Sequence, residues 1–128
     1  MIVLDTHVWL WWMIRDPRLP ARVRRRIEAT EVGVASMSCY EVVLLERRRR
    51  IALDRDVRSW IELALAQDGV RALSLDTAVA TEAALLDPLG FPAGPADRII
   101  YATARAHGAV LATKDERIRA HDPERTLW

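Results

Sequence analysis

Ile2-Val3-Leu4-Asp5-Thr6 opens the chain with three consecutive apolar residues that stop at a carboxylate. An unbroken run of β-favouring apolar residues predicts a short strand buried on both faces, as in a parallel sheet. Ligands of open α/β sheets bind beyond the carboxyl ends of the strands, so Asp5 is expected to face a site. Asp is also a preferred N-cap residue for a helix starting near Thr6, and this segment alone leaves both interpretations open.

Segments of strand and helix character alternate along the rest of the chain. Further strands are predicted at residues 32–35, 70–75 and 109–112, with an edge strand at 126–128, and helices at 6–14, 20–31, 38–50, 54–69, 97–106 and 116–121. This alternation predicts an α/β fold with a central parallel sheet of four to five short strands and helices on both faces. Residues 87–95 hold three prolines and two glycines and are predicted to be a connector.

Length and composition favour one compact domain over residues 1–128. The chain has 51% hydrophobic residues, enough for a real core, and it is too short for two domains. Its 19 basic and 18 acidic residues leave a formal charge of +1, which excludes attraction to nucleic acid or anionic lipid through bulk charge. Any polyanion must therefore bind a local patch.

The sequence predicts a cytoplasmic protein that makes no contact with a membrane. Its single cysteine, Cys39, cannot form an internal disulfide, which favours a reducing compartment. No basic segment precedes the apolar N-terminus, and the run from Val8 to Ile14 is much shorter than the roughly 18 apolar residues of a membrane span.

The helix predicted at 6–14 is apolar on nearly every side and carries Trp9, Trp11 and Trp12. Such a helix is either buried in the core or covered by a partner. Because tryptophan is enriched at interface hot spots, these residues are a candidate contact for a partner, while internal packing of all three stays open.

Arginines gather in two helical stretches. Arg22 and residues 24–26 are predicted to form a solvated helix face. Residues 47–50 are four arginines at the end of a helix, where they either favour the helix dipole or follow an RNA backbone. The sequence does not separate these two alternatives.

Four acidic residues fall where a predicted strand ends or a helix begins, namely Asp5, Glu41, Asp97 and Asp115. In a parallel α/β fold these positions share one edge of the sheet. Glu41 also fits a capping box with Ser38, in which its side chain would only cap the helix. Two carboxylates about 5 Å apart repel by roughly 3 kcal/mol at an effective dielectric of 20, so such a cluster requires a counterion or protons.

Carboxylate oxygens without nearby cysteines and with few histidines suit Mg²⁺ or Mn²⁺ and disfavour zinc. A cation held in this way stabilises charge on a phosphate and activates a water nucleophile. The acidic set therefore indicates phosphoryl chemistry.

Other polar residues are given lesser roles. Leu75-Asp76-Thr77-Ala78-Val79 echoes Leu4-Asp5-Thr6-His7-Val8, and Asp76 is predicted to be a helix cap only. His7 is expected to be packed or solvated, and Cys39 has no partner base nearby in sequence that would make it a nucleophile. Thr113 is a candidate hydrogen-bond partner for a carboxylate or a water of the site.

With these motifs in place, the chain resembles PIN-domain ribonucleases of the VapC toxin type. The resemblance rests on residues 4–8, Ser38-x-x-Glu41, Ala96-Asp97-Arg98-Ile99-Ile100, Thr113-x-Asp115-Glu116 and the terminal Leu127-Trp128, which span nearly the whole chain. It implies a PIN-like three-layer sandwich and a Mg²⁺- or Mn²⁺-dependent endoribonuclease that cuts RNA with an activated water, with tRNA or another structured RNA as a candidate substrate.

The resemblance also implies roles and partners. Asp5 and Asp97 would hold the metal ion, and Glu41 and Asp115 would complete the cluster and orient or deprotonate water. A homodimer and an inhibiting antitoxin, whose tail lies over the site, would be the protein partners. Relatives often carry a further Asp where this chain has Gly94, and this difference concerns substrate contacts at the rim.

Two other enzyme classes and a non-catalytic binding module are alternatives to this ribonuclease. A haloacid-dehalogenase-like phosphatase needs a second Asp where this chain has His7, and a receiver-like phosphoacceptor needs adjacent acids after the first strand. A non-catalytic PIN-like module that binds RNA or a partner is the main alternative. The full set of four acids argues against it.

Overall fold

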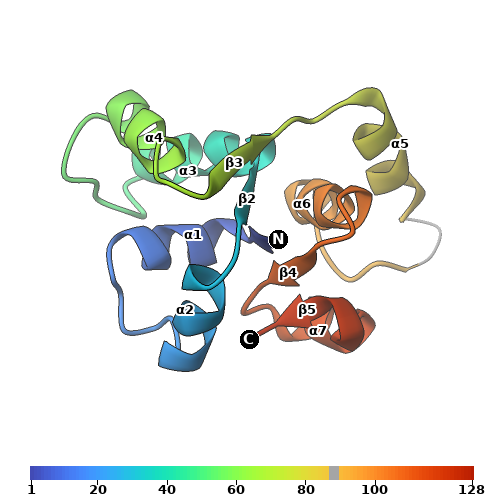
Figure 1. Ribbon diagram of the computed structural model, residues 1–128. Helices are drawn as coiled ribbons and strands as arrows, with labels where there is room; N and C mark the ends of the chain where they lie inside the picture. Colours follow the sequence, from blue (N-terminus) through green and yellow to red (C-terminus); the bar gives the residue numbers. More distant parts are fainter. Residues whose placement is uncertain (87–89) are drawn as a thin grey trace.

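The computed structural model describes residues 1–86 and 90–128 and contains a five-stranded parallel sheet (Figure 1). The strands are β1 (Ile2–Leu4), β2 (Val32–Ala35), β3 (Val70–Leu73), β4 (Val110–Ala112) and β5 (Thr126–Leu127), in the order β3-β2-β1-β4-β5. Every neighbouring pair is parallel. The predicted α/β fold is confirmed, and β1 lies at the centre of the sheet.

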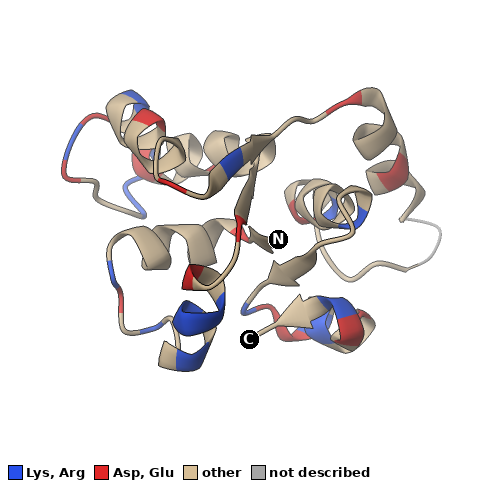
Figure 2. Cartoon of the chain, viewed as in Figure 1, with Lys and Arg blue, Asp and Glu red and all other residues tan. Residues whose placement is uncertain are grey.

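Helices cover both faces of this sheet (Figure 1). They are α1 (Thr6–Met13), α2 (Ala21–Glu28), α3 (Ser36–Arg47), α4 (Val57–Leu65), α5 (Thr77–Leu85), α6 (Pro95–Ala106) and α7 (Glu116–His121), followed by a short 3₁₀ helix, η2 (Pro123–Arg125). Charged residues lie almost entirely on the helices and loops (Figure 2).

The alternation of side chains along β1 creates two hydrophobic clusters. Ile2 and Leu4 join the cluster formed with α1, α2 and α4, whereas Val3 joins the cluster formed with α6 and α7. All three residues are buried, as expected for a central strand that is covered on both faces.

The helix that carries Glu41 begins two residues earlier than predicted. α3 starts at Ser36, directly after β2, and its N-cap Ala35 makes no side-chain capping bond. Ser38 is therefore inside the helix, and the capping box inferred for Ser38 and Glu41 is wrong. Both side chains are instead free to interact with another element of the fold.

The tryptophans of α1 lie mainly in the core. Trp9 and Trp11 are 0% and 5% exposed, and Trp12 is partly buried against the same cluster. The suggestion that these residues form a partner surface is therefore wrong for Trp9 and Trp11 in this chain. The small residues of β4 and α4, such as Ala112 and Ala64, leave space for their rings in the same cluster.

Some predicted boundaries differ from the structure. The strand predicted to reach Leu75 ends at Leu73. α3 ends at Arg47, and Arg49 adopts a positive φ of 56°, so the following arginines lie in a turn. Whether they contact RNA stays a prediction. Of the connector predicted at 87–95, residues 87–89 lie outside the described part of the chain.

Within the described residues, no helix is both long enough and apolar enough to cross a membrane.

Candidate active site

The carboxyl end of β1 positions the first acidic side chain. Asp5 follows Leu4 directly, and its backbone N–H donates to the carbonyl of Ala112 in the neighbouring strand β4. Its carboxylate also caps α1, because Oδ1 accepts the Thr6 backbone N–H at 2.8 Å. The two interpretations of Asp5 are therefore compatible, since one oxygen caps a helix while the residue faces the edge of the sheet.

Three acidic side chains from distant parts of the sequence meet at this edge. Asp5, Glu41 and Asp97 each offer one carboxylate oxygen, and these oxygens all lie within 4.8 Å of one another. They come from the end of β1, from α3 and from the first turn of α6. All three are partly buried, so their mutual repulsion is only partly screened by water.

Burial and repulsion raise the pKa of two of these acids. For Asp97, desolvation and the nearby charges of Asp5 and Glu41 raise the pKa from 3.8 to about 6. Desolvation also raises the pKa of Asp5, although hydrogen bonds from Thr113 and Thr6 oppose the shift. Carboxyl groups whose charged form is disfavoured in this way are suited to binding a cation.

Two buried hydroxyl groups hold Glu41. The Oγ1 of Thr6 donates to Oε1 of Glu41 at 2.6 Å and lies 3.1 Å from Oγ of Ser38. A hydroxyl has one proton and a carboxylate only accepts, so Ser38 supplies the proton of the second contact. Thr6 and Ser38 are 2% and 0% exposed, which fixes this network inside the protein.

The sequence interpretation missed this network, although two signals were available. Thr6 is one of two polar residues in a mostly apolar helix, and Ser38 lies one helical turn before Glu41. The capping-box interpretation assigned Ser38 to its own helix and therefore concealed its contact with α1.

Thr113 holds Asp5 from the opposite side. Its Oγ1 donates to Oδ2 of Asp5 at 2.7 Å and accepts the backbone N–H of Asp115 at 3.1 Å. Thr113 directly follows β4 and is fully buried. The expectation that Thr113 bonds a carboxylate of the site is confirmed.

Asp115 lies outside the group of three acids. Its Oδ1 caps α7 by accepting the backbone N–H groups of Arg117 and Ile118, and its Oδ2 pairs with Arg117 at 3.3 Å. Burial opposes ionisation of Asp115, but these bonds outweigh it and lower its pKa. Its charge still contributes to the raised pKa values of Asp5 and Asp97. A part for Asp115 in catalysis stays a prediction.

The other residues discussed from sequence are also placed. Asp76 accepts the Val79 backbone N–H at 2.9 Å and caps α5, as predicted. Cys39 is half-buried, and burial raises the pKa of its thiol, which disfavours the thiolate that a nucleophile requires. His7 is exposed and contacts Trp11 through the ring edge, with centroids 6.0 Å apart.

A parallel α/β sheet with acids gathered at the end of its central strand defines a class of protein, and comparison with known families identifies it. The family model described as the PIN domain matches residues 2–122, so the chain belongs to the PIN domain family. It is 42% identical over 130 residues to Ribonuclease VapC22 of Mycobacterium tuberculosis (strain ATCC 25618 / H37Rv), covering 99% of this chain and 98% of that protein. The resemblance to VapC-type PIN-domain ribonucleases is confirmed.

Solved structures share the fold at lower sequence identity. A toxin–antitoxin complex from Klebsiella pneumoniae matches with a TM-score of 0.72 and 18% identity, covering 100% of this chain and 97% of that chain. DNA-bound VapBC from Salmonella typhimurium matches with a TM-score of 0.71 and 20% identity, covering 98% and 96%. At these identities the matches establish the fold alone.

Proposed function

We propose that this protein is a metal-dependent endoribonuclease and the toxin of a toxin–antitoxin pair. The observation that carries the proposal is the convergence of Asp5, Glu41 and Asp97, whose carboxylate oxygens lie within 4.8 Å of one another. Membership of the PIN domain family and the similarity to a named ribonuclease support the same activity.

The donor set fits a hard divalent cation, Mg²⁺ or Mn²⁺. All the ligand atoms in the group are carboxylate oxygens. Burial first, and neighbouring negative charge second, raise the pKa values of Asp5 and Asp97, and a cation would compensate both effects. Asp5 and Asp97 would hold the ion, with Glu41 beside them. When bound, such an ion stabilises charge on the scissile phosphate and lowers the pKa of a coordinated water.

The protein's own residues would orient the acids and the water. Thr6 and Ser38 restrict the rotamer of Glu41, and Thr113 restricts that of Asp5, so the carboxylates are preorganised before substrate arrives. Thr6 bonds Oε1 of Glu41, and the other oxygen of this carboxylate would accept a proton from the attacking water. Asp115 is held in place by capping α7, and its negative charge would act on the three acids from outside their group.

Cleavage of RNA by the purified protein tests this proposal. Mg²⁺ or Mn²⁺ is expected to support cutting of a single-stranded RNA, excess EDTA is expected to stop it, and Asp97→Asn is expected to be inactive although folded. Sequencing the new 5′ ends after a short pulse of expression would identify the RNA target. Full activity in EDTA, or undiminished cleavage by Asp97→Asn, would end the nuclease proposal.

The same experiment addresses the alternative of a non-catalytic PIN-like module. Such a module would bind RNA in Mg²⁺ or Mn²⁺ without cutting it. The intact group of three acids favours the enzyme, because a binding module has no need of a repulsive carboxylate cluster.

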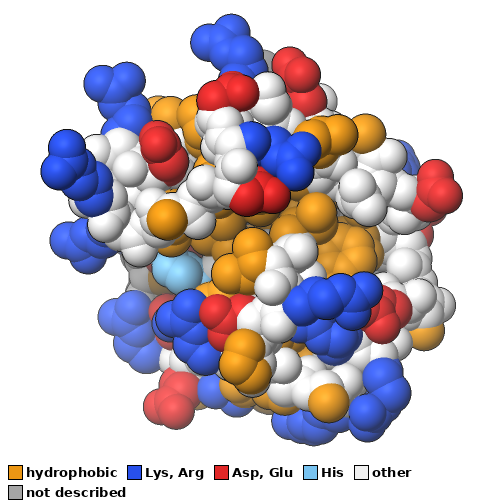
Figure 3. Space-filling model, turned by 90° about the vertical axis from the view of Figure 1, so that its left-hand side faces the viewer, with side chains coloured by type: hydrophobic (Ala, Val, Ile, Leu, Met, Phe, Trp, Pro, Cys, Tyr) orange, Lys and Arg blue, Asp and Glu red, His pale blue; other side chains and the backbone are white. Residues whose placement is uncertain are grey.

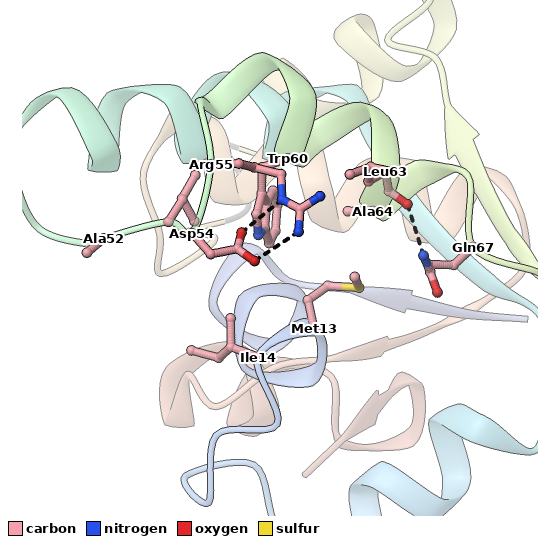
Figure 4. Close-up of a pocket in the computed structure, with 10 residues that line it drawn as sticks. Met13, Ile14, Ala52, Asp54, Arg55, Trp60, Leu63, Ala64 and Gln67 are labelled. Carbon is pink, nitrogen blue, oxygen red and sulfur yellow. Dashed lines mark hydrogen bonds and ion pairs between the residues drawn. The ribbon is translucent and has the colours of Figure 1, made fainter.

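We further propose that an antitoxin binds to the face formed by α1 and α4. An open groove of about 640 Å³ lies there, with Met13 and Ile14 facing Trp60, Leu63 and Ala64 (Figure 4). Ile14 and Leu63 are 54% and 47% exposed, and Trp60 packs edge-on against the buried Trp9. On the face shown in Figure 3, hydrophobic side chains occupy the centre, and charged side chains of both signs surround them. Apolar side chains of an antitoxin segment suit such a groove.

Binding of the cognate antitoxin to charged variants tests the groove. Leu63→Asp and Ile14→Asp are expected to raise the Kd of the complex at least tenfold. Leu85→Asp, at a similarly exposed leucine in α5, is expected to leave the Kd unchanged. Equal binding by all three variants would remove the groove from the proposal. A homodimer and a cytoplasmic location remain predictions, and light scattering of the toxin without its partner measures the first of them.

A further inference from the structure

Two cationic side chains share one buried indole beside the acidic cluster. The ring of Trp11 is 5% exposed, and the guanidinium carbon of Arg18 and the Nζ of Lys114 lie 4.8 and 5.0 Å from its centroid. Arg18 follows α1 in the loop before α2, whereas Lys114 follows β4. Residues far apart in sequence therefore bring two positive charges to the same ring, and we call this pair of side chains the Trp11 rim.

The Trp11 rim is linked to the acidic cluster by residues that are neighbours in the sequence. Lys114 directly follows Thr113, whose hydroxyl donates to Asp5 at 2.7 Å. His7, two residues beyond Asp5, touches the edge of the Trp11 ring, with centroids 6.0 Å apart. The rim and the acidic cluster are thus connected through Thr113 and through His7.

The cations of the rim keep donors for a ligand. Lys114 is the single lysine of the chain, is exposed, and forms no ion pair with any carboxylate in residues 1–86 and 90–128. Arg18 uses Nε and Nη2 on Asp16, so its Nη1 has no hydrogen-bond partner in the described part of the chain. The cation–π contacts with Trp11 position both groups without consuming their hydrogen-bond donors.

Charge explains why an RNA nuclease would place cations here. Three carboxylates repel a polyanion, and a bound divalent ion compensates only the phosphate that it contacts. Cations just outside the cluster would attract the adjoining part of the backbone and fix the register of the strand. The net charge of +1 makes such a local patch necessary, because the chain as a whole does not attract RNA.

We propose that Lys114 and Arg18, held on Trp11, bind an RNA phosphate next to the one that is cleaved. This inference rests on the nuclease function proposed above and names a substrate contact of that site. An acidic antitoxin segment is the competing occupant. RNA is favoured because Lys114 directly follows Thr113, which bonds Asp5 of the acidic cluster. The apolar groove proposed for the antitoxin lies at the other end of α1, at Met13 and Ile14.

Salt-dependent RNA binding tests the rim directly. Lys114→Gln, Arg18→Gln and the double variant are compared in an Asp97→Asn background, with a fluorescent single-stranded RNA at 50 to 200 mM salt. Loss of one phosphate contact is expected to lower the slope of log K against log salt by about 0.7 and to weaken binding several-fold at the lower salt. The double variant is expected to lose about twice that slope.

Two matched variants separate a phosphate contact from a general charge effect. Arg25→Gln removes an equally exposed positive charge from α2 and is expected to keep the full slope. Lys114→Arg retains the positive charge and is expected to keep the wild-type salt slope. In the otherwise wild-type enzyme, the KM of Lys114→Gln is expected to rise by the same factor as its Kd for RNA.

Three outcomes would overturn the inference. The salt slope could be unchanged in Lys114→Gln, or Arg25→Gln could lose as much slope as Lys114→Gln. The third outcome is that Lys114→Gln weakens binding of the antitoxin and leaves binding of RNA unchanged. These results leave the nuclease proposal standing if Asp97→Asn is inactive. Conversely, cleavage by Asp97→Asn would end the nuclease proposal whatever the slope, so the two failures are distinguishable.

Discussion

Leu4-Asp5-Thr6 and Leu75-Asp76-Thr77 have the same three residue types, and in both segments the Asp caps the helix that begins at the Thr. Their surroundings differ. Asp5 follows the central strand directly, between β2 and β4, whereas Asp76 comes three residues after the edge strand β3 has ended. Asp5 consequently meets Thr113 and two other acids, while the carboxylate of the exposed Asp76 accepts the Val79 backbone N–H in its own helix. Position in the sheet, and not the local motif, separates a candidate metal ligand from a cap.

The threonines of the two segments differ in the same way. Thr6 is 2% exposed and donates to Glu41, whereas the exposed Thr77 offers its carbonyl oxygen to the hydroxyl of Thr81 in the same helix. A central strand places its helix between two neighbouring elements, so both residues of the motif find long-range partners. An edge strand does not.

Removing the charge of each Asp breaks the comparison most sharply. Asp5→Asn is expected to reduce RNA cleavage by about 10³-fold or more, because loss of a metal ligand removes several kcal/mol of transition-state stabilisation. Asp76→Asn is expected to cleave at the wild-type rate, because its carboxylate lies outside the group of three acids. Initial rates with a labelled RNA measure both, and circular dichroism checks that both variants are folded. Equal activity of the two variants would contradict the distinction.

Replacing the hydroxyls gives the next largest effect. Thr6→Val removes the proton donor of Glu41 and is expected to weaken Mn²⁺ binding and cleavage by about 10- to 100-fold, the usual cost of losing a partner that orients a ligand. Thr6→Ser is expected to recover most of the loss, and Thr77→Val to have no effect on either quantity. Calorimetric Mn²⁺ titration separates metal affinity from turnover. Normal Mn²⁺ affinity in Thr6→Val would show that Glu41 needs no support.

The acidic cluster is expected to lower the stability of the metal-free protein in a pH-dependent way. Asp97 has a pKa raised from 3.8 to about 6, so its ionised form is disfavoured in the folded state. This penalty is absent below pH 4, develops as the pH rises through 4 to 6, and is complete above 6. Asp97→Asn is therefore expected to be more stable than the wild type at pH 7 by about 1–2 kcal/mol after allowance for solvent screening, and equal to it at pH 4.

Thermal melts with and without Mg²⁺ measure this difference. Saturating Mg²⁺ is expected to stabilise the wild type and to leave Asp97→Asn unchanged. A stability difference that is the same at pH 4 and pH 7 would exclude charge repulsion as its cause.

The cap at Asp76 gives the smallest effect. Asp76→Ala removes the acceptor for the Val79 N–H and is expected to cost about 1 kcal/mol of unfolding free energy, as for other N-caps, with no change in cleavage. Urea unfolding measures the loss, and Asp76→Asn, which keeps an accepting oxygen, is its control. A loss of cleavage in Asp76→Ala at full stability would connect this segment to the site after all.

The hydrophobic pattern of α1 does not predict what covers its tryptophans. A helix that is apolar on every side is compatible with a core or with a partner, and the sequence of α1 alone contains nothing that separates them. Trp9 is buried against Trp60 of α4. Trp11 is buried against Arg18, Lys114 and Trp128, which come from other parts of the chain. The proposed partner surface lies instead at the exposed Ile14 and Leu63, which the sequence pattern did not single out.

The sequence by itself determined the α/β class and the order of its elements, and it placed Asp5, Glu41 and Asp97 among four candidate acids, because hydrophobic periodicity and position at a strand end can be read locally. Only the tertiary structure decided that Thr6 and Ser38 hold Glu41, that Asp115 stands outside the group of three, and that two cations share Trp11. These contacts join residues up to about a hundred positions apart, and which of them form depends on the order of strands in the sheet, which no local pattern encodes.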